Sequence, residues 1–422
     1  MVKKVFINTG AQIAGKAITA SSTLLLTVIV GKSLGPAGFG DFTKIFTFVG
    51  YFYIFSDFGL NAAYIKLSQR EENNSLINAL FGLRLSLALS LAALAIGLGL
   101  LLPHNSAAGT GFSPLVKIGI AIASITIITQ ATLTSINAYF QKNLRYDLSA
   151  LAAVLGTLAA TTTTVLIYFY SPALNMYVSS YVFGGLVVVF FAWYFARRYL
   201  KAKIWPMFSL ASAKMLIGYS WPVGVALIFN LIYFRMDILI LSYTRPPAEV
   251  GIYGLAYQFF EASLAVPIFF ANSLFPVLTG LYVSDKKEYS HQAKKWGFLL
   301  FGISILATLG LTAASFIIPI FFEKFQGSQT ALIILALGMP FFFITALLWH
   351  IAIVTGRQKL LIPTYFIGGV ANISLNLIFI PKYGYLAAAA STVVCEALIT
   401  ALLAIALKYR RKTGIIWQTG SV

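Results

Sequence analysis

Ionisable side chains inside otherwise apolar stretches are the residues of this sequence that could do chemistry. At the centre of a membrane helix such a side chain costs at least about 2.5 to 3.5 kcal/mol, so we expect it to face water or a partner. Cationic groups in that position can bind phosphate oxygens, and carboxyl groups can carry a proton or another cation. The residues with these properties are Lys16, Asp57, Arg84, Arg235, Asp237, Glu261 and Glu396.

Three of these charges lie toward the cytoplasmic side of the membrane, as the distribution of basic residues assigns it. Arg84 falls in the cytoplasmic third of an apolar stretch over 76–102, and Asp57 in the inner half of the stretch over 42–66. Lys16 lies in the first turns of its stretch, where it is also typical of a side chain that snorkels to the interface. Asp57 has a structural alternative as well, because it could pair with Arg84.

The other charges lie deeper or toward the outside. Glu261 and Glu396 fall near the middle of their stretches, and Arg235 and Asp237 fall in the outer third of theirs. Two residues that are two positions apart on a helix do not share a face, so we expect one of Arg235 and Asp237 to face a cavity and the other to tie its helix to a neighbour. Glu261 is our first candidate for a proton carrier, with Asp57 and Glu396 as alternatives. A carboxyl that only hydrogen-bonds a neighbouring helix stays open for each.

Neutral polar side chains accompany the charges at helical spacing. Such groups bond between helices as often as they contact a transported molecule, so both roles stay open. The polar positions that we assign to the cavity or to ion coupling are Asn61, Gln258 and Asn376.

Composition shows which elements must position these residues. The chain has 59% hydrophobic and 10% charged residues and a mean hydropathy of +0.85, whereas charged residues make up about 25% of a soluble domain. A membrane helix needs about 20 residues, so 422 residues with short loops hold about twelve helices. We expect an all-α polytopic membrane protein with spans at 12–31, 42–66, 76–102, 114–140, 149–170, 175–196, 215–242, 250–281, 292–319, 328–353, 360–380 and 384–407.

The basic residues are concentrated in the loops on one side of the membrane. Most of the 30 lysines and arginines fall in alternate loops, and the richest loop holds Arg197, Arg198, Lys201, Lys203 and Lys214. By the positive-inside rule, both termini lie in the cytoplasm and the protein is a multi-pass protein of the cytoplasmic membrane. The net charge of +18 then follows from topology and from attraction to anionic lipid rather than from a nucleic-acid partner. We interpret the N-terminal apolar run as an uncleaved first span.

The most basic loop divides the chain into two halves of six spans each. We expect an N-terminal lobe at 1–200, a cytoplasmic linker at 201–214 and a C-terminal lobe at 215–422. PAGFGDF, which starts at Pro36, and PAEVGIY, which starts at Pro247, occupy matching places in the two halves. An even number of spans gives both halves the same orientation, so the sequence predicts a parallel repeat, a common plan of transporters.

Several kinds of site are excluded. The sequence has no GxxxxGK[ST] phosphate-binding loop, and no loop is long enough for a separate catalytic domain, so we expect no enzyme activity. Cys395 is the single cysteine, and His104, His291 and His350 lie far apart, so we expect no disulfide and no metal site. We expect no cofactor beyond a coupling ion, H+ or Na+.

Five segments together resemble the Wzx-type flippases of lipid-linked oligosaccharides, the O-antigen flippases, within the multidrug/oligosaccharidyl-lipid/polysaccharide exporter superfamily. The resemblance covers nearly the whole chain. It is carried by GKSLGPAGFGDF from Gly31, FSDFGLNAAYIK from Phe55, FRMDILIL from Phe234, EVGIYGLAYQF from Glu249 and NISLNLIFIPKYGYLAAAAST from Asn372. The length argues against the fourteen-span relatives that carry murein precursors.

The resemblance implies a two-lobed bundle with a cationic central cavity that opens alternately to the two sides. It implies an isoprenoid-pyrophosphate-linked glycan as cargo, with Arg84 and Arg235 as cavity cations, while Asp57 and Asp237 stand at family positions whose role could be packing. From its position in the sequence, we add Lys16 to the candidate cavity cations. Polysaccharide polymerase machinery is a possible partner besides the cargo and the bilayer. Two alternatives remain: a cation-coupled multidrug exporter of the same superfamily, and an unpowered scaffold or channel for a polysaccharide synthase.

Overall fold

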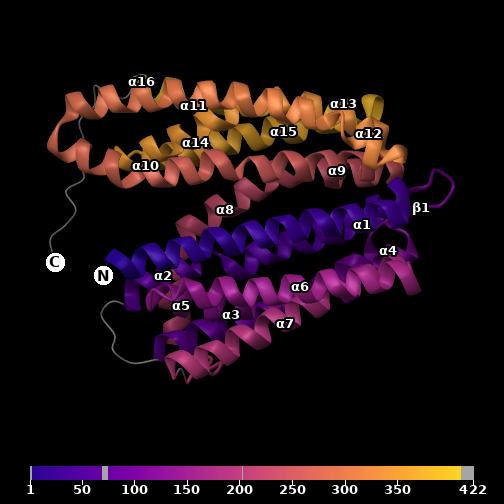
Figure 1. Cartoon of the computed structure of the whole chain (residues 1–422), viewed down its shortest axis with the longest axis horizontal. Coiled ribbons are helices and arrows are strands. Elements are labelled where there is room, and N and C mark those ends of the chain that lie inside the picture. Colours follow the sequence, from indigo (N-terminus) through magenta and orange to yellow (C-terminus); the bar gives the residue numbers. More distant parts are fainter. Residues whose placement is uncertain (1, 69–74, 202, 410–422) are drawn as a thin grey trace. The chain divides into compact units, whose positions relative to one another are not determined.

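The structure is a computed structural model that describes residues 2–68, 75–201 and 203–409, without the side chains of residues 2–14, 16–17, 62, 66, 222, 226, 276 and 409. Helices make up nearly all of the described chain (Figure 1). The first elements are α1 (Val2–Asp57), α2 (Leu60–Leu67), α3 (Ser75–Leu101), β1 (His104–Asn105), β2 (Thr110–Gly111), α4 (Pro114–Ala123), α5 (Ile125–Lys142), α6 (Tyr146–Tyr170) and α7 (Leu174–Leu200). The others are α8 (Leu210–Thr244), α9 (Pro247–Ser263), α10 (Ala265–Ser284), α11 (Lys286–Ser315), α12 (Ile318–Phe321), η2 (Glu323–Phe325), α13 (Gln326–Ala336), α14 (Met339–Val354), η3 (Gln358–Leu360), α15 (Leu361–Tyr383) and α16 (Tyr385–Tyr409).

The predicted all-α membrane fold is confirmed, with a difference in how the spans are counted. Within the described residues, ten helical segments are long and apolar enough to cross a membrane, or eleven if the bent pair α13–α14 is one span. The prediction was about twelve. The segment Ile18–Asp57 has 40 residues, which at about 1.5 Å per residue is twice the roughly 30 Å of a hydrocarbon core. This segment therefore accounts for two of the predicted spans.

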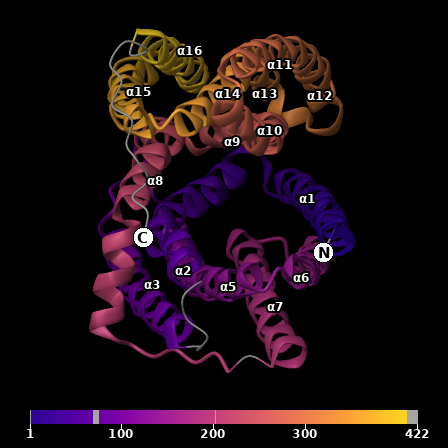
Figure 2. The ribbon, with the colours of Figure 1, turned by 90° about the vertical axis from the view of Figure 1, so that its left-hand side faces the viewer.

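The long helix α1 is a hairpin of two arms. Gly35 has a left-handed backbone (φ 64°) and Pro36 follows it, so the helix breaks there. The hydroxyl of Tyr177 at the start of α7 donates to Ser33 (2.7 Å), whereas Ser56 lies beside Arg84 near the start of α3. The chain thus runs to one end of the bundle and back, and Figure 2 shows two separate indigo arms.

The chain forms two compact units. Unit 1 consists of Met1–Leu231 and Ser242–Gly251, and unit 2 consists of Ile232–Leu241 and Ile252–Val422. Packing therefore assigns both ends of α8 and the start of α9 to unit 1, whereas Ile232–Leu241 in the middle of α8 belongs to unit 2. This boundary between compact units differs from the division into two six-span lobes at 201–214, which rests on the predicted topology. The division into lobes stays a prediction.

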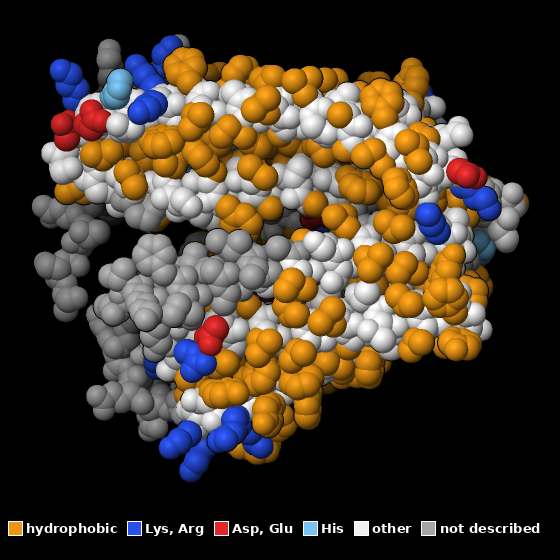
Figure 3. All heavy atoms as spheres, in the orientation of Figure 1, with side chains coloured by type: hydrophobic (Ala, Val, Ile, Leu, Met, Phe, Trp, Pro, Cys, Tyr) orange, Lys and Arg blue, Asp and Glu red, His pale blue; other side chains and the backbone are white. Residues whose placement is uncertain are grey.

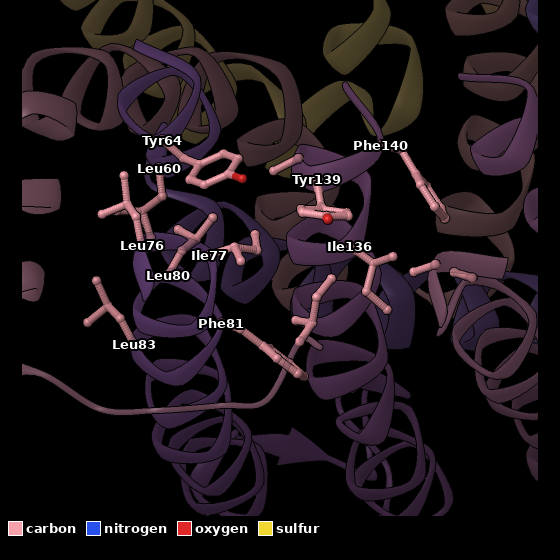
Figure 4. Packing of buried hydrophobic residues seen from close by; sticks show 14 of the residues in the cluster. Leu60, Tyr64, Leu76, Ile77, Leu80, Phe81, Leu83, Ile136, Tyr139 and Phe140 are labelled. Carbon is pink, nitrogen blue, oxygen red and sulfur yellow. The ribbon is translucent and has the colours of Figure 1, made fainter. Parts of the chain in front are cut away.

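Each unit has its own apolar core. In unit 1, α2, α3 and α5 contribute the buried cluster of Figure 4, which includes Leu60, Tyr64, Leu80 and Phe140. In unit 2, α8, α14, α15 and α16 meet in a cluster around Tyr233, Tyr365, Ile399 and Leu403. These cores hold the predicted polar site residues of each unit in fixed places on their helices.

The surface fits lipid as the solvent. Large apolar side chains are exposed along the helix sides, for example Leu306 (69%) and Phe298 (79%) on α11. Figure 3 shows apolar side chains over most of the visible face and charged side chains gathered toward helix ends. A soluble protein does not expose apolar surface on this scale, so the observation agrees with the hydropathy of the sequence.

Candidate functional site

Arg84 lies at the centre of a buried cluster in unit 1 and is itself 0% exposed. Its Nε donates to the Ser56 carbonyl (3.3 Å), and its Nη1 donates to Asn61 Oδ1 (3.1 Å) and Ser135 Oγ (3.3 Å). Its Nη2 donates to the carbonyl (3.4 Å) and the carboxylate (2.8 Å) of Asp57. A guanidinium has five N–H groups, so the protein provides an acceptor for each of them.

A helix break explains why Arg84 is needed at this place. Phe58 and Gly59, which separate α1 from α2, both have left-handed backbones (φ 41° and 69°). The break leaves carbonyl oxygens at the end of α1 without regular helical donors, and Arg84 binds two of them. Gly224 of α8 packs so closely on the Phe58 ring that an added Cβ would lie 2.7 Å from it. The span expected at 42–66 therefore contains a break at Phe58 and Gly59, which was not predicted from the sequence.

Arg235 in unit 2 has a different environment. Its Nη2 lies 2.7 Å from Glu261 Oε1 and 2.9 Å from Oε2, and the side chains are 31% and 46% exposed. The guanidinium also lies over the Tyr257 ring, 5.5 Å from its centroid, and the Tyr257 hydroxyl donates to the Phe234 carbonyl (2.9 Å). Within the described part of the chain, Nη2 is the one nitrogen of Arg235 with a hydrogen bond, so its other N–H groups can donate to an anion.

Asp237 is on the same helix as Arg235 and is 1% exposed. Its carboxylate accepts hydrogen bonds from the Tyr253 hydroxyl, from Thr392 Oγ1 (3.4 Å) and from the Ile238 backbone amide (2.7 Å). Asp237 therefore ties α8 to α9 and α16.

A second buried carboxyl in unit 2 belongs to Glu396, which is 2% exposed and accepts a hydrogen bond from the Tyr233 hydroxyl (2.6 Å). On α15, Asn376 Nδ2 donates to Asn372 Oδ1 (2.9 Å), and both side chains are buried. Asn372 Nδ2 and Asn376 Oδ1 have no partner among the described residues. Buried amide atoms without a partner often mark a place for water or an ion.

The structure thus groups the predicted residues into separate clusters. Arg84, Asp57 and Asn61 form one, Arg235 and Glu261 form another, and Asp237 and Glu396 are each held by hydroxyl groups. Gln258 is half-buried on α9, on the turn before Glu261. The side chain of Lys16 lies outside the described residues. No group of three or more His, Cys, Asp or Glu among the described residues is placed to hold a metal ion.

Sequence reasoning missed the tyrosines that organise unit 2. Tyr253 binds Asp237, and Tyr257 lies under Arg235. A signal was present, because Tyr253, Tyr257 and Glu261 follow one another at intervals of four residues on α9 and therefore share a face.

Comparisons with known proteins identify the same fold and a family. A family model described as polysaccharide biosynthesis protein matches residues 1–282. A Shigella flexneri protein that is described as a candidate O-antigen transporter is 22% identical over 381 residues, which are 88% of this chain and 90% of that protein. An uncharacterised membrane protein of Methanocaldococcus jannaschii is 27% identical over 205 residues, which are 46% of this chain and 39% of that protein.

Among solved structures, the lipid II flippase MurJ in an inward closed conformation gives a TM-score of 0.77 at 17% identity, with 96% of this chain and 87% of that chain covered. A multidrug resistance MATE transporter in an inward-facing conformation gives 0.76 at 13% identity, with 94% of this chain and 98% of that chain covered. At these identities the likeness establishes the fold and says nothing about the cargo.

Proposed function

The chain belongs to the polysaccharide biosynthesis protein family, and from this premise we propose that it is a flippase for an isoprenoid-pyrophosphate-linked oligosaccharide. It moves this cargo from the cytoplasmic to the outer leaflet of the cytoplasmic membrane by alternating access, as a step in building a surface polysaccharide. Family and fold together make it a multi-pass membrane protein of a transporter class whose relatives are not enzymes. A polysaccharide polymerase is a further proposed partner.

Moving such a cargo across the bilayer requires a site that binds it and requires no catalysis. A pyrophosphate with several sugars must cross a hydrocarbon layer of roughly 30 Å without leaving its polar groups unpaired. The isoprenoid tail can stay in lipid throughout. A guanidinium suits the headgroup because it binds phosphate oxygens through two parallel N–H bonds.

The observation that carries the proposal is the contrast between the two arginines. All N–H groups of Arg84 are bound by protein acceptors and its side chain is buried, so in this conformation it stabilises unit 1. The Arg235 side chain is 31% exposed, and only its Nη2 donates a hydrogen bond to a described residue, Glu261. Of the two predicted headgroup contacts, Arg235 is therefore the first candidate, and a cargo role for Arg84 requires another conformation.

The first prediction tests this assignment. We expect Arg235→Ala to abolish the movement of a lipid-linked oligosaccharide in proteoliposomes, while the level of folded protein in the membrane stays at the wild-type value. Arg235→Lys should restore part of the activity, since an ammonium group keeps the charge and loses the two-pronged geometry. Wild-type transport by Arg235→Ala would remove this residue from the headgroup site.

The second candidate function is a cation-coupled multidrug exporter. Exported drugs of this class are usually cationic, so they need exposed carboxylates, and Glu261 is exposed in the described structure. The Arg235 guanidinium neutralises that carboxylate and favours anionic cargo instead. Dye efflux measured beside glycan transport separates the two functions.

Coupling to H+ or Na+ is a further part of the proposal. Glu396 and Asp237 are buried and are bound by hydroxyl or amide groups rather than by cationic side chains, so either could accept an ion. Glu261 and Asp57 are the exposed alternatives. Imposing a proton or a sodium gradient on vesicles identifies the ion, and the Gln or Asn variant that loses the gradient dependence identifies the carrier.

A further inference from the structure

Arg235 holds an anion that the protein itself supplies. Both carboxylate oxygens of Glu261 lie within hydrogen-bond distance of Nη2, at 2.7 and 2.9 Å. A phosphate group would use the same donor in the same way, because carboxylate and phosphate oxygens are alternative partners of a guanidinium. The protein therefore presents an arginine whose Nη2 donor is already occupied by its own carboxylate.

This ion pair has the properties of an exchangeable contact. The Arg235 and Glu261 side chains are 31% and 46% exposed, whereas Arg84 in its cluster is 0% exposed. Exposed ion pairs contribute little to stability and open easily. Both residues lie on helices that are apolar enough to cross a membrane, and a charged surface of this kind would be costly against lipid, so the exposed side of the pair faces water.

The two partners are not held equally. Arg235 lies over the ring of Tyr257, which is 2% exposed and is fixed by the hydrogen bond from its hydroxyl to the Phe234 carbonyl. The described structure gives the Glu261 carboxylate no partner other than Arg235. If the pair opens, Tyr257 keeps the guanidinium in place and the carboxylate is the group that moves.

The backbone around Glu261 also allows movement. α9 ends at Ser263, the Leu264 amide donates to the Glu261 carbonyl (3.1 Å) in a tighter turn, and α10 begins at Ala265. Pro267 in the first turn of α10 has no N–H with which to continue the helix. Glu261 thus lies on the last turn before a break, where a small change of backbone can redirect the side chain.

We propose that Glu261 is a resident competitor that keeps weak anionic ligands off Arg235. Its carboxylate occupies Arg235 when no cargo is bound, and a pyrophosphate displaces it. This inference rests on the proposed function, in which Arg235 binds the pyrophosphate. A phospholipid phosphodiester carries one negative charge, as the carboxylate does, and gains little by replacing it. A pyrophosphate carries more charge and more acceptor oxygens, so it displaces Glu261 while the abundant phospholipids of the membrane do not.

The test compares two probes on purified protein in neutral detergent micelles. We would measure the Kd for a polyprenyl diphosphate without sugars and for phosphatidylglycerol, through the change of tryptophan fluorescence. Glu261→Gln keeps the size of the side chain and removes its charge. It should tighten diphosphate binding by about two- to fivefold, the range set by the worth of an exposed ion pair, and tighten phosphatidylglycerol binding by a similar factor, because opening the ion pair costs the same for either ligand. The fraction of protein occupied by phosphatidylglycerol at a fixed concentration should therefore rise.

Glu249→Gln is the matched control, because Glu249 is on the same helix and forms an ion pair with Arg245 (2.7 Å). We expect this variant to leave both dissociation constants unchanged. Glu261→Ala serves as a second variant, and thermal unfolding confirms that each protein is folded.

Unchanged or weaker binding of both probes in the folded Glu261 variants would overturn the competitor role. The proposed function would survive that result if Arg235→Ala still lost diphosphate binding and transport. Diphosphate binding and transport that persist in Arg235→Ala would instead remove the headgroup site itself. The two failures are therefore distinguishable.

Discussion

At the scale of single residues, Arg84 and Arg235 carry the same signal in the sequence, an arginine inside an apolar helix, and the fold gives them opposite environments. The sequence suggested Asp57 as a partner for Arg84, and the structure contains that ion pair (2.8 Å). It did not suggest the pair of Arg235 with Glu261, because the rotation of α9 against α8 decides which side chains meet. Acceptors contributed by several helices at once are not visible in a linear pattern.

The contrast leads to a stability prediction. Arg84→Leu leaves the Asp57 carboxylate without its cation and the carbonyls at the break after α1 without donors. Breaking a buried ion pair costs about 3 to 5 kcal/mol, and the cost here lies at the lower end because the Asp57 side chain is 37% exposed. Thermal unfolding of purified protein should show a clear loss of stability.

Arg235→Leu is the matched control for Arg84→Leu. It breaks an exposed pair worth about 0 to 1 kcal/mol, so it should abolish transport and leave the unfolding temperature nearly unchanged. Equal unfolding temperatures for Arg84→Leu and the wild type would show that the buried cluster does not stabilise unit 1.

At the scale of elements, helix breaks show how far the sequence predicts local structure. The break at Gly35 and Pro36 lies in the expected loop between the spans at 12–31 and 42–66, because glycine and proline together mark a turn. The bend of 46° between α13 and α14 falls just before Pro340, one of the prolines inside an expected span. The break after Asp57 was not predicted, since a single glycine in an apolar run is tolerated in a helix and the stabilising donor, Arg84, comes from another helix.

Close packing of two helix starts gives a prediction at this scale. Gly40 lies against the carbonyl oxygen of Pro247, and Gly251 lies against the carbonyl oxygen of Pro36, so an added Cβ at either glycine would overlap backbone. Gly40→Ala should therefore force the helices apart and lower stability by about 1 to 3 kcal/mol, as overpacking does.

Gly50 is the matched control on the same arm of α1, since a Cβ there would meet nothing within 4 Å. Gly50→Ala should keep or raise the unfolding temperature, because alanine favours helix by about 1 kcal/mol over glycine. A Gly40→Ala protein as stable as Gly50→Ala would mean that the two helix starts separate without cost.

At the scale of the whole molecule, the contact just described is reciprocal, and it joins the positions that the repeat matches. Pro36 and Gly40 in the first half correspond to Pro247 and Gly251 in the second, and each proline carbonyl meets the glycine of the other half. The sequence predicts the correspondence from spacing alone. The reciprocal packing could not be predicted, because it depends on how the two helix starts cross.

The last prediction concerns orientation in the membrane. Arg197 and Arg198 lie in the last turn of α7, and exposed lysines follow at Lys201 and Lys203. Because positively charged loops stay in the cytoplasm, a reporter fused after Lys203 should give a cytoplasmic signal. A reporter fused after Arg245 should give an external one, since the helix α8 separates the two sites.

Fusion after Lys412 completes the topology test. Six spans per half return the chain to its starting side, so this reporter should agree with the one after Lys203. An external signal after Lys203 would reverse the orientation, and the headgroup would then meet Arg235 from the opposite leaflet. A disagreement between the reporters after Lys203 and Lys412 would mean an odd number of spans in the second half. The two halves could then not be a parallel repeat, and the reciprocal glycine contact would need another origin.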